Sequence, residues 1–476
     1  MKHYKNSIIK EYLIGQCAMG IKVKYLFIMV LLILGITSCS DFVEVDPPKN
    51  NLVSETVFED PATVESALAN IYYKMREQGM VSGRFGFSVL LSLYSDEQDY
   101  YNSSADYLEL YNNNVTSQNT LVTAWWSHAY NMIYVANDII SGVEASQNLS
   151  VNEKRQFRGQ ALFIRGYIHS LLVSLYGDIP YITTTNYLIN NKVSRQSVNE
   201  VYDFIISDLI EASELMNDAD ASGEHVIPNA SVAQALLSRI YLYTEQWELA
   251  EATANDLIES HSLELDINQV FLKDSEETLW QFKPNGVSDN NTYEANQFVI
   301  RFIPGQTYAL SDALLASFEP GDLRFTNWTG SLTSSDGLTT LYFAHKYKVL
   351  FDEMAALEYS IIFRLTEQYL IRAESRAQLG DIAGALEDLN AIRNRAGLVN
   401  SVASTKNELL EAVLQERRVE FFTEHGHRWF DLKRFGVANS VLSSIKANWQ
   451  DTDVLFPIPE TELEVNPNLK PQNAGY

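Results

Sequence analysis

The sequence predicts a mainly α-helical fold, in which paired helices form a scaffold interrupted by irregular, loop-rich insertions. Apolar residues recur at helical spacing through most of the chain, and a pattern of small and large residues repeats once over two helix pairs. No linker rich in Pro, Gly or Ser divides the chain after residue 60. With 46% hydrophobic and 12% aromatic residues, the chain has enough apolar side chains to bury a core.

Residues 1–38 are predicted to be a secretory signal peptide. Lys22 and Lys24 precede the apolar run Tyr25–Ile36, which holds 12 residues, whereas a membrane-spanning helix needs about 20. Small residues follow the run and lead directly into Cys39. This order is similar to the bacterial lipobox, in which the cysteine is acylated and becomes the first residue of the mature chain. We therefore expect a lipid on Cys39.

The other possibility is that Cys39 stands by chance near an ordinary cleavage site. The only other cysteine, Cys17, lies in the segment predicted to be removed, so the mature chain has one cysteine and no disulfide partner. Translation can start at Met1 or Met19, and Met19 gives a signal of normal length. Residues 39–58 are acidic and contain two adjacent prolines, which predicts an extended tether.

The charge of the chain excludes some partners. The sequence has 61 acidic and 35 basic residues and a formal net charge of −26. Such a surface repels phosphate backbones, so nucleic-acid binding is disfavoured, as is docking to anionic lipid through a basic patch. Any membrane contact is therefore expected to come from the lipid.

Residues 59–476 are predicted to form one domain, and its first part, 59–262, is mainly helical. Asp60 is an expected N-cap, Pro61 suits the first helical position, and this helix should run to about Gln78. A second helix carries the aromatic and small residues between Trp126 and Asn137. A third is expected to end at Gly177, before Pro180.

An internal repeat follows. The first copy has Ser238, Tyr241, Ala250, Ala254 and Leu257, and the second has Ala373, Arg376, Ala385, Leu389 and Ile392 at the same spacing. Small residues at matching positions let two antiparallel helices approach closely. This spacing is typical of tetratricopeptide helix pairs, and the turns are expected at Glu245 and at Gly380.

Two segments lack helical periodicity. Residues 79–119 are predicted to be a long loop, rich in tyrosine and amide side chains. Residues 263–345 are interpreted as an insertion packed on the scaffold, with a strand-like alternation over Leu279–Phe282. Because long loops in compact domains are often functional, both segments are candidate binding surfaces.

The C-terminal part, 346–476, contains a helix with charges on its apolar stripe. Arg417 stands where an apolar residue is expected, and Glu416, Glu420 and Glu424 are close enough to pair with it and with Arg418. The expected result is a partly buried network of ion pairs. His425 and His427 could instead bind a metal, but the sequence indicates no third ligand, so neither a metal nor a cofactor is predicted.

The chain resembles the SusD-like (RagB-type) outer-membrane nutrient-binding lipoproteins in the motifs described above and in several others. The matching residues are the motif at Cys39, Trp126 to Asn137, Phe163-Ile164-Arg165, Tyr176 to Pro180, Phe363-Arg364-Leu365, Glu367, Tyr369-Leu370, Ala373-Glu374, Glu416-Arg417-Arg418, Glu420 to Arg434, Phe456 to Pro459, Glu462, Asn466-Pro467 and Gln472-Asn473. The resemblance covers essentially the whole mature chain. It implies a scaffold of tetratricopeptide-like helix pairs with a more irregular ligand-binding half.

The resemblance also implies a cellular role. Family members are tethered to the outer membrane by lipid, cover a SusC-like TonB-dependent transporter, and capture oligosaccharides or, in some members, peptides. Acidic residues after Cys39 are similar to the signal that sends such lipoproteins to the outer face. The family motifs are structural, and they do not identify the ligand.

A sugar ring has an apolar face and a rim of hydroxyls, so its site requires aromatic rings beside carboxylate, amide or guanidinium groups. The predicted ligand-binding residues are Asp96, Tyr100, Tyr101 and Asn102 in the first segment and Tyr293, Arg301 and Trp328 in the second. The other interpretation is that Tyr100 and Trp328 only pack their own loops.

Three classes of function are compatible with this composition. A binding protein for nutrient import is favoured by the lipid anchor, the aromatic segments and the resemblance. A surface hydrolase would need positioned carboxylates, which Asp96, Glu97 and Asp99 could supply, but such clusters are usually solvated, and the protein is predicted not to be an enzyme. A scaffold that holds other proteins and has no ligand of its own is the third class.

Cys39→Ala tests the lipid anchor. Fatty-acid labelling should be lost in this variant, and the protein should move from the membrane fraction to the soluble fraction, because the sequence offers no basic patch to hold it. Undiminished membrane association of the variant would contradict the prediction.

Overall fold

Two long helices of the N-terminal part begin at side chains that cap them. The computed structural model describes residues 57–286, 290–351 and 353–476. Asp60 caps α3 (Pro61–Glu77) by accepting a hydrogen bond from the amide of Ala62, as predicted. Ser150 caps α7 (Val151–Tyr176) in a reciprocal capping box, and α7 ends at Gly177, where φ is 71°.

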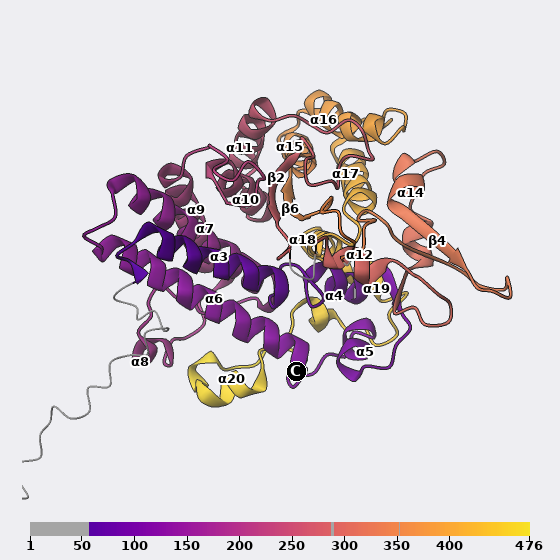
Figure 1. Cartoon of the computed structure of the whole chain (residues 1–476). Helices are drawn as coiled ribbons and strands as arrows, with labels where there is room; N and C mark the ends of the chain where they lie inside the picture. Colours follow the sequence, from indigo (N-terminus) through magenta and orange to yellow (C-terminus); the bar gives the residue numbers. More distant parts are fainter. Residues whose placement is uncertain (1–56, 287–289, 352) are drawn as a thin grey trace, which may run out of the picture. The chain divides into compact units, whose positions relative to one another are not determined.

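The structure is mainly α-helical, which confirms the predicted fold class (Figure 1). The other helices are α4 (Phe87–Tyr94), α5 (Ala105–Tyr111), α6 (Thr120–Ala145), α8 (Tyr187–Asn190), α9 (Val198–Leu215), α10 (Ala230–Tyr243), α11 (Trp247–Ser260), α12 (Tyr293–Phe298), α13 (Asp312–Leu315), α14 (Leu323–Trp328), α15 (Leu365–Leu379), α16 (Ile382–Arg395), α17 (Lys406–Glu420), α18 (His427–Arg434), α19 (Ala438–Leu442) and α20 (Glu460–Val465), with 3₁₀ turns at Asp451–Val454 and Pro467–Leu469. The strands are β1 (Gln98–Tyr100), β2 (Thr278–Phe282), β3 (Tyr308–Leu310), β4 (Thr329–Thr333), β5 (Thr340–Ala344) and β6 (Ser360–Arg364).

One buried arginine joins three helices of the N-terminal part. Helix α7 packs against both α6 and α9. Arg165 of α7 donates two hydrogen bonds, of 2.6 and 2.7 Å, to the carboxylate of Asp208 on α9 and one of 2.9 Å to the amide oxygen of Asn137 on α6. Because a buried charge is tolerated only when it is paired, this contact specifies how the three helices dock.

The predicted repeat forms two helix pairs, α10–α11 and α15–α16. The small residues Ala250 and Ala385 are fully buried where the helices of each pair meet. The two turns fall at equivalent positions: Glu245 has a φ of 59° and Gly380 a φ of 90°, so both turns require left-handed backbone. Helix α11 packs against α15, so the pairs stack although residues 261–364 separate them in sequence.

Residues 79–119 are not the single long loop that the sequence predicted. They form α4, β1 and α5. Every residue of α4 is buried. Because no side of this helix faces solvent, its sequence lacks the alternation of apolar and polar faces by which an amphipathic helix is recognised. Residues 263–345 contain short helices and strands, and β2 pairs with β6. All five residues of β2 are buried, so the predicted alternation does not separate a buried from an exposed face.

The C-terminal glutamates form a buried charge network, but not with the predicted partners. Glu420 is fully buried and accepts hydrogen bonds from Arg364 (2.6 Å), Arg395 (2.5 Å) and Arg324 (3.0 Å). Arg417 instead pairs with Asp431 at 2.8 Å. The helical spacing predicted partners on the same helix, whereas α17 points its carboxylates at arginines from distant segments.

The signal peptide, Cys39 and the predicted tether up to residue 56 lie outside the described residues. Within residues 57–286, 290–351 and 353–476, no helix combines the length and hydropathy needed to cross a membrane.

Glu420→Gln should lower the free energy of unfolding by about 3–5 kcal/mol at pH 7, because three arginines would lose a buried counter-charge. Burial raises the pKa of Glu420, but the charges of Arg395, Arg364 and Arg324 outweigh burial and hold it well below its usual range. The depressed pKa means that this stabilisation is present above the unfolded pKa of about 4.3 and is lost as the pH falls further. Urea unfolding curves at pH 7 and below 4 measure both effects.

Glu411→Gln is the matched control, because Glu411 is exposed on the same helix. Its unfolding curve should match that of the parent. Equal stability of the parent and Glu420→Gln at pH 7 would contradict a stabilising role for the network.

Candidate functional site

The structure brings parts of the two candidate segments together. Strand β1 pairs antiparallel with β3, with Tyr100 opposite Tyr308, and the amide of Tyr101 donates to the carbonyl of Thr307 at 2.9 Å. Ser311 extends the contact, because its amide donates to the carbonyl of Glu97. More than 200 residues separate the strands in sequence, and side chains from both segments therefore meet on one surface.

Five tyrosines gather at this pairing, and we call them the tyrosine surface. They are Tyr100, Tyr101, Tyr107, Tyr111 and Tyr308. The ring of Tyr100 is stacked on Tyr107, with centroids 5.7 Å apart and planes at 10°, and contacts Tyr308 at 5.8 Å and Tyr111 at 6.5 Å. Mutually packed rings lose little further freedom when a ligand binds, so the surface is a preorganised platform.

Tyr101 is the most exposed member of the tyrosine surface, with 45% of the side chain accessible. Asn102 beside it is also exposed, and its amide oxygen accepts from the amide of Ser103 at 2.6 Å. Arg301 is exposed on the segment that leads into β3. Next to it, Phe302 is 63% exposed, and its ring lies close to the backbone of Gly305. Aromatic, amide and guanidinium groups thus reach solvent around the β1–β3 pairing.

The tyrosines stay protonated at neutral pH. Burial, followed by the charge of Asp99, raises the pKa of Tyr111 to about 12, and its hydroxyl donates to that carboxylate at 3.0 Å. Burial and the nearby Asp99 and Asp312 raise the pKa of Tyr101 as well. The surface therefore presents neutral hydroxyls, which can donate and accept hydrogen bonds.

Asp96, a predicted ligand contact, is buried in a cluster of ion pairs. The side chain is 4% exposed, and its carboxylate accepts from Arg428 at 2.7 Å twice and from Arg418 at 2.7 Å. Burial raises the pKa of Asp96, but the hydrogen bonds and charges of these arginines lower it further, so it stays ionised. Asp96 instead anchors the chain just before β1 to α17 and α18.

Trp328 is also a core residue rather than a ligand contact. It is 1% exposed, its indole nitrogen donates to the carbonyl of Ile267 at 2.9 Å, and its ring packs edge-on against Phe271. Tyr293 is half-buried and contacts Phe351, with centroids 6.0 Å apart.

The acidic residues near β1 are buried or hydrogen-bonded within the protein. Glu97 is buried, and its burial, together with the charge of Asp96, raises its pKa to about 8. Asp96 is already paired with arginines, and Asp99 accepts from Tyr111. The part of the chain that the structure describes holds no group of three or more His, Cys, Asp and Glu residues placed to bind a metal.

The sequence prediction omitted Tyr107, Tyr111 and Tyr308. All three lie in the two candidate binding segments. The aromatic residues of those segments were therefore the feature of the sequence that could have identified them. Which of these rings meet depends on the pairing of β1 with β3, which no local pattern encodes.

Comparisons with known proteins agree with this architecture. Residues 41–242 match a family model described as starch-binding and associating with the outer membrane, and residues 305–476 match the model of the SusD family. The SusD-like protein P2 of Formosa agariphila is 26% identical over an alignment of 523 residues, which covers 95% of this chain and 100% of that protein. A SusD-like protein of Bacteroides ovatus is 23% identical over 83% of this chain and 79% of its own.

Solved structures show the same fold. A SusD superfamily protein from Bacteroides vulgatus superposes with a TM-score of 0.77 at 21% identity, covering 88% of this chain and 100% of its own. A laminarin-binding SusD-like protein superposes with a TM-score of 0.75 at 21% identity, covering 87% and 99%.

Proposed function

Because this chain belongs to the SusD-like family of carbohydrate-binding proteins, we propose that it captures oligosaccharides on the tyrosine surface. The observation that carries the proposal is the exposed ring of Tyr101, which follows the packed ring of Tyr100 directly in the chain and precedes the exposed Asn102. An aromatic face stacks on the C–H groups of a sugar, and neighbouring amides and hydroxyls bind its rim. The similarity to a laminarin-binding protein supports a glycan ligand.

The proposal includes the cellular setting. The chain is anchored at the outer membrane by a lipid on Cys39, faces outside, and passes its ligand to a SusC-like TonB-dependent transporter. A lone lipoprotein cannot move a solute across a bilayer, so capture requires such a partner. The family model that matches residues 41–242 is described as associating with the outer membrane, which supports this location.

Tyr101→Ala should weaken glycan binding about five- to thirtyfold, since one exposed stacking ring contributes about 1–2 kcal/mol. The melting temperature should change little, because Tyr101 is exposed and lies outside the core. A binding screen of plant, host and microbial oligosaccharides, with peptides included, identifies the ligand first, and calorimetry then compares the variant with the parent.

Two further variants serve as controls for this experiment. Tyr134→Ala removes a tyrosine of similar exposure, 47%, from α6 and should bind like the parent. Trp328→Ala should leave binding by the folded protein intact but lower stability by about 3–5 kcal/mol, because it empties a core site. Parental affinity in Tyr101→Ala would contradict the proposed site, and a screen that finds only peptides would contradict a glycan ligand.

The partner is tested separately. Tagged full-length protein, extracted from native membranes in mild detergent, should bring down a large outer-membrane transporter. Recovery only as a free monomer would contradict delivery to such a transporter, while glycan binding would stand on the calorimetry.

A further inference from the structure

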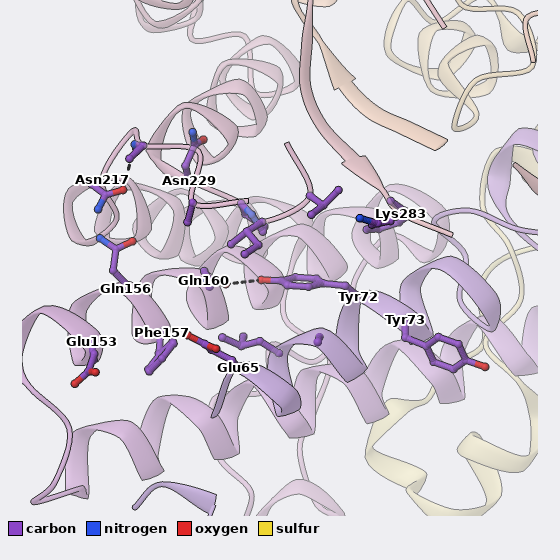
Figure 2. Close-up of a pocket in the computed structure, with 18 of the residues that line it drawn as sticks. Glu65, Tyr72, Tyr73, Glu153, Gln156, Phe157, Gln160, Asn217, Asn229 and Lys283 are labelled. Carbon is purple, nitrogen blue, oxygen red and sulfur yellow. Dashed lines mark hydrogen bonds between the residues drawn. The ribbon is translucent and has the colours of Figure 1, made fainter. Parts of the chain in front are cut away.

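A cavity lies between helices of the N-terminal part and shares no residue with the tyrosine surface. It has a volume of about 610 Å³ and opens between α3, the first turns of α7, the segment 217–229 and the chain after β2 (Figure 2). This volume falls in the range of small-molecule sites, about 300–1,000 Å³.

The walls of the cavity are mainly apolar. Leu68 on α3, Phe157 on α7 and Phe282 on β2 line it, and each is almost fully buried. The ring of Tyr72 crosses one side of the cavity, and Tyr73, 47% exposed, stands at its rim (Figure 2). A ligand that fills this space must therefore have substantial apolar surface.

One buried amide in the wall has an unused donor. Gln160 is 8% exposed, and its amide oxygen accepts from the hydroxyl of Tyr72 at 2.8 Å (Figure 2). Its amide nitrogen donates to no residue in the described part of the chain, although it lies in the wall of the cavity. The nitrogen is accessible from the cavity, so an acceptor atom on a ligand can bond to it in place of water.

More amides follow on the same face of α7. Asn152, Gln156 and Gln160 are four residues apart, so they form a row along the cavity. Asn217 faces Gln156 across the opening (Figure 2). No hydrogen bond from the side chain of Asn152 or Gln156 joins them to the described residues, so this row is available to a ligand.

Three of the four charged residues in the wall are already paired, and the fourth, Glu65, is exposed on α3. Arg76 donates to the carbonyl of Lys283 at 2.7 Å and pairs with Glu77, and the ammonium of Lys283 pairs with Glu224 at 2.5 Å. Glu153 completes the capping box of α7. The interior thus offers neutral amides, a hydroxyl and apolar rings, which favours an uncharged ligand.

We propose that this cavity binds acylated sugar units of neutral glycans. An unsubstituted sugar carries several hydroxyls per ring, and these walls would leave many of them without partners. Acylation replaces hydroxyl donors with carbonyl acceptors and methyl groups, which match the free amide donors and the apolar walls. The site is additional to the tyrosine surface and has a separate test.

The probes are partly acetylated xylotriose and mannotriose, each compared with the same sample after alkaline deacetylation. The protein is the full mature chain carrying Cys39→Ala. Calorimetry and ligand-observed NMR should show binding of at least one acetylated probe, at least tenfold tighter than its deacetylated form. Absence of binding of both acetylated probes at millimolar concentration, or equal affinity for the two forms, would overturn the proposal.

Variants place the binding within the cavity. Ala69→Trp puts a large ring into the opening from an exposed position on α3 and should abolish binding without unfolding the protein. Gln160→Leu removes the buried donor and should weaken binding at least tenfold. Tyr134→Ala, which removes an exposed tyrosine on α6 outside both sites, should bind the acetylated probe like the parent. Parental affinity in a folded Ala69→Trp variant would refute the site even if Gln160→Leu fails to fold.

Discussion

The pairing of Glu420 with three arginines is the constraint on which the assembly of this protein depends. Arg324, Arg364 and Arg395 come from α14, β6 and α16, and all are buried with Glu420. Buried charges are tolerated only when they are paired, so α17 stabilises the native position of all three segments through this one carboxylate. The network therefore selects one arrangement of segments from three regions of the sequence.

The C-terminal helices also hold the tyrosine surface in place through buried ion pairs. Asp96, just before β1, is held by Arg418 of α17 and Arg428 of α18. The hydroxyl of Ser311, just after β3, donates to the carbonyl of Asp96 at 2.6 Å. Both strands under the tyrosines are thereby tied to the C-terminal helices, which fixes a binding surface that three-residue strands could not stabilise by themselves.

The two candidate binding regions use different parts of the fold. The tyrosine surface combines residues on or next to β1, α5 and β3 and exposes the ring of Tyr101, which suits stacking on an extended chain of sugars. The cavity lies between long helices and encloses its amides, which suits a compact group. The helical scaffold thus encloses a cavity, and the irregular segments provide an accessible aromatic surface.

The sequence by itself determined the helical class, the caps and the repeat, because these depend on contacts within a few residues. Asp60 and Gly177 act locally, and the small residues of the helix pairs are periodic. The tertiary structure alone decided which polar and aromatic side chains face solvent. Asp96 and Trp328 have the composition of ligand contacts but are buried by partners far away in sequence, whereas Tyr308 joins the surface through the β1–β3 pairing. Burial depends on these long-range contacts, and no local pattern records them.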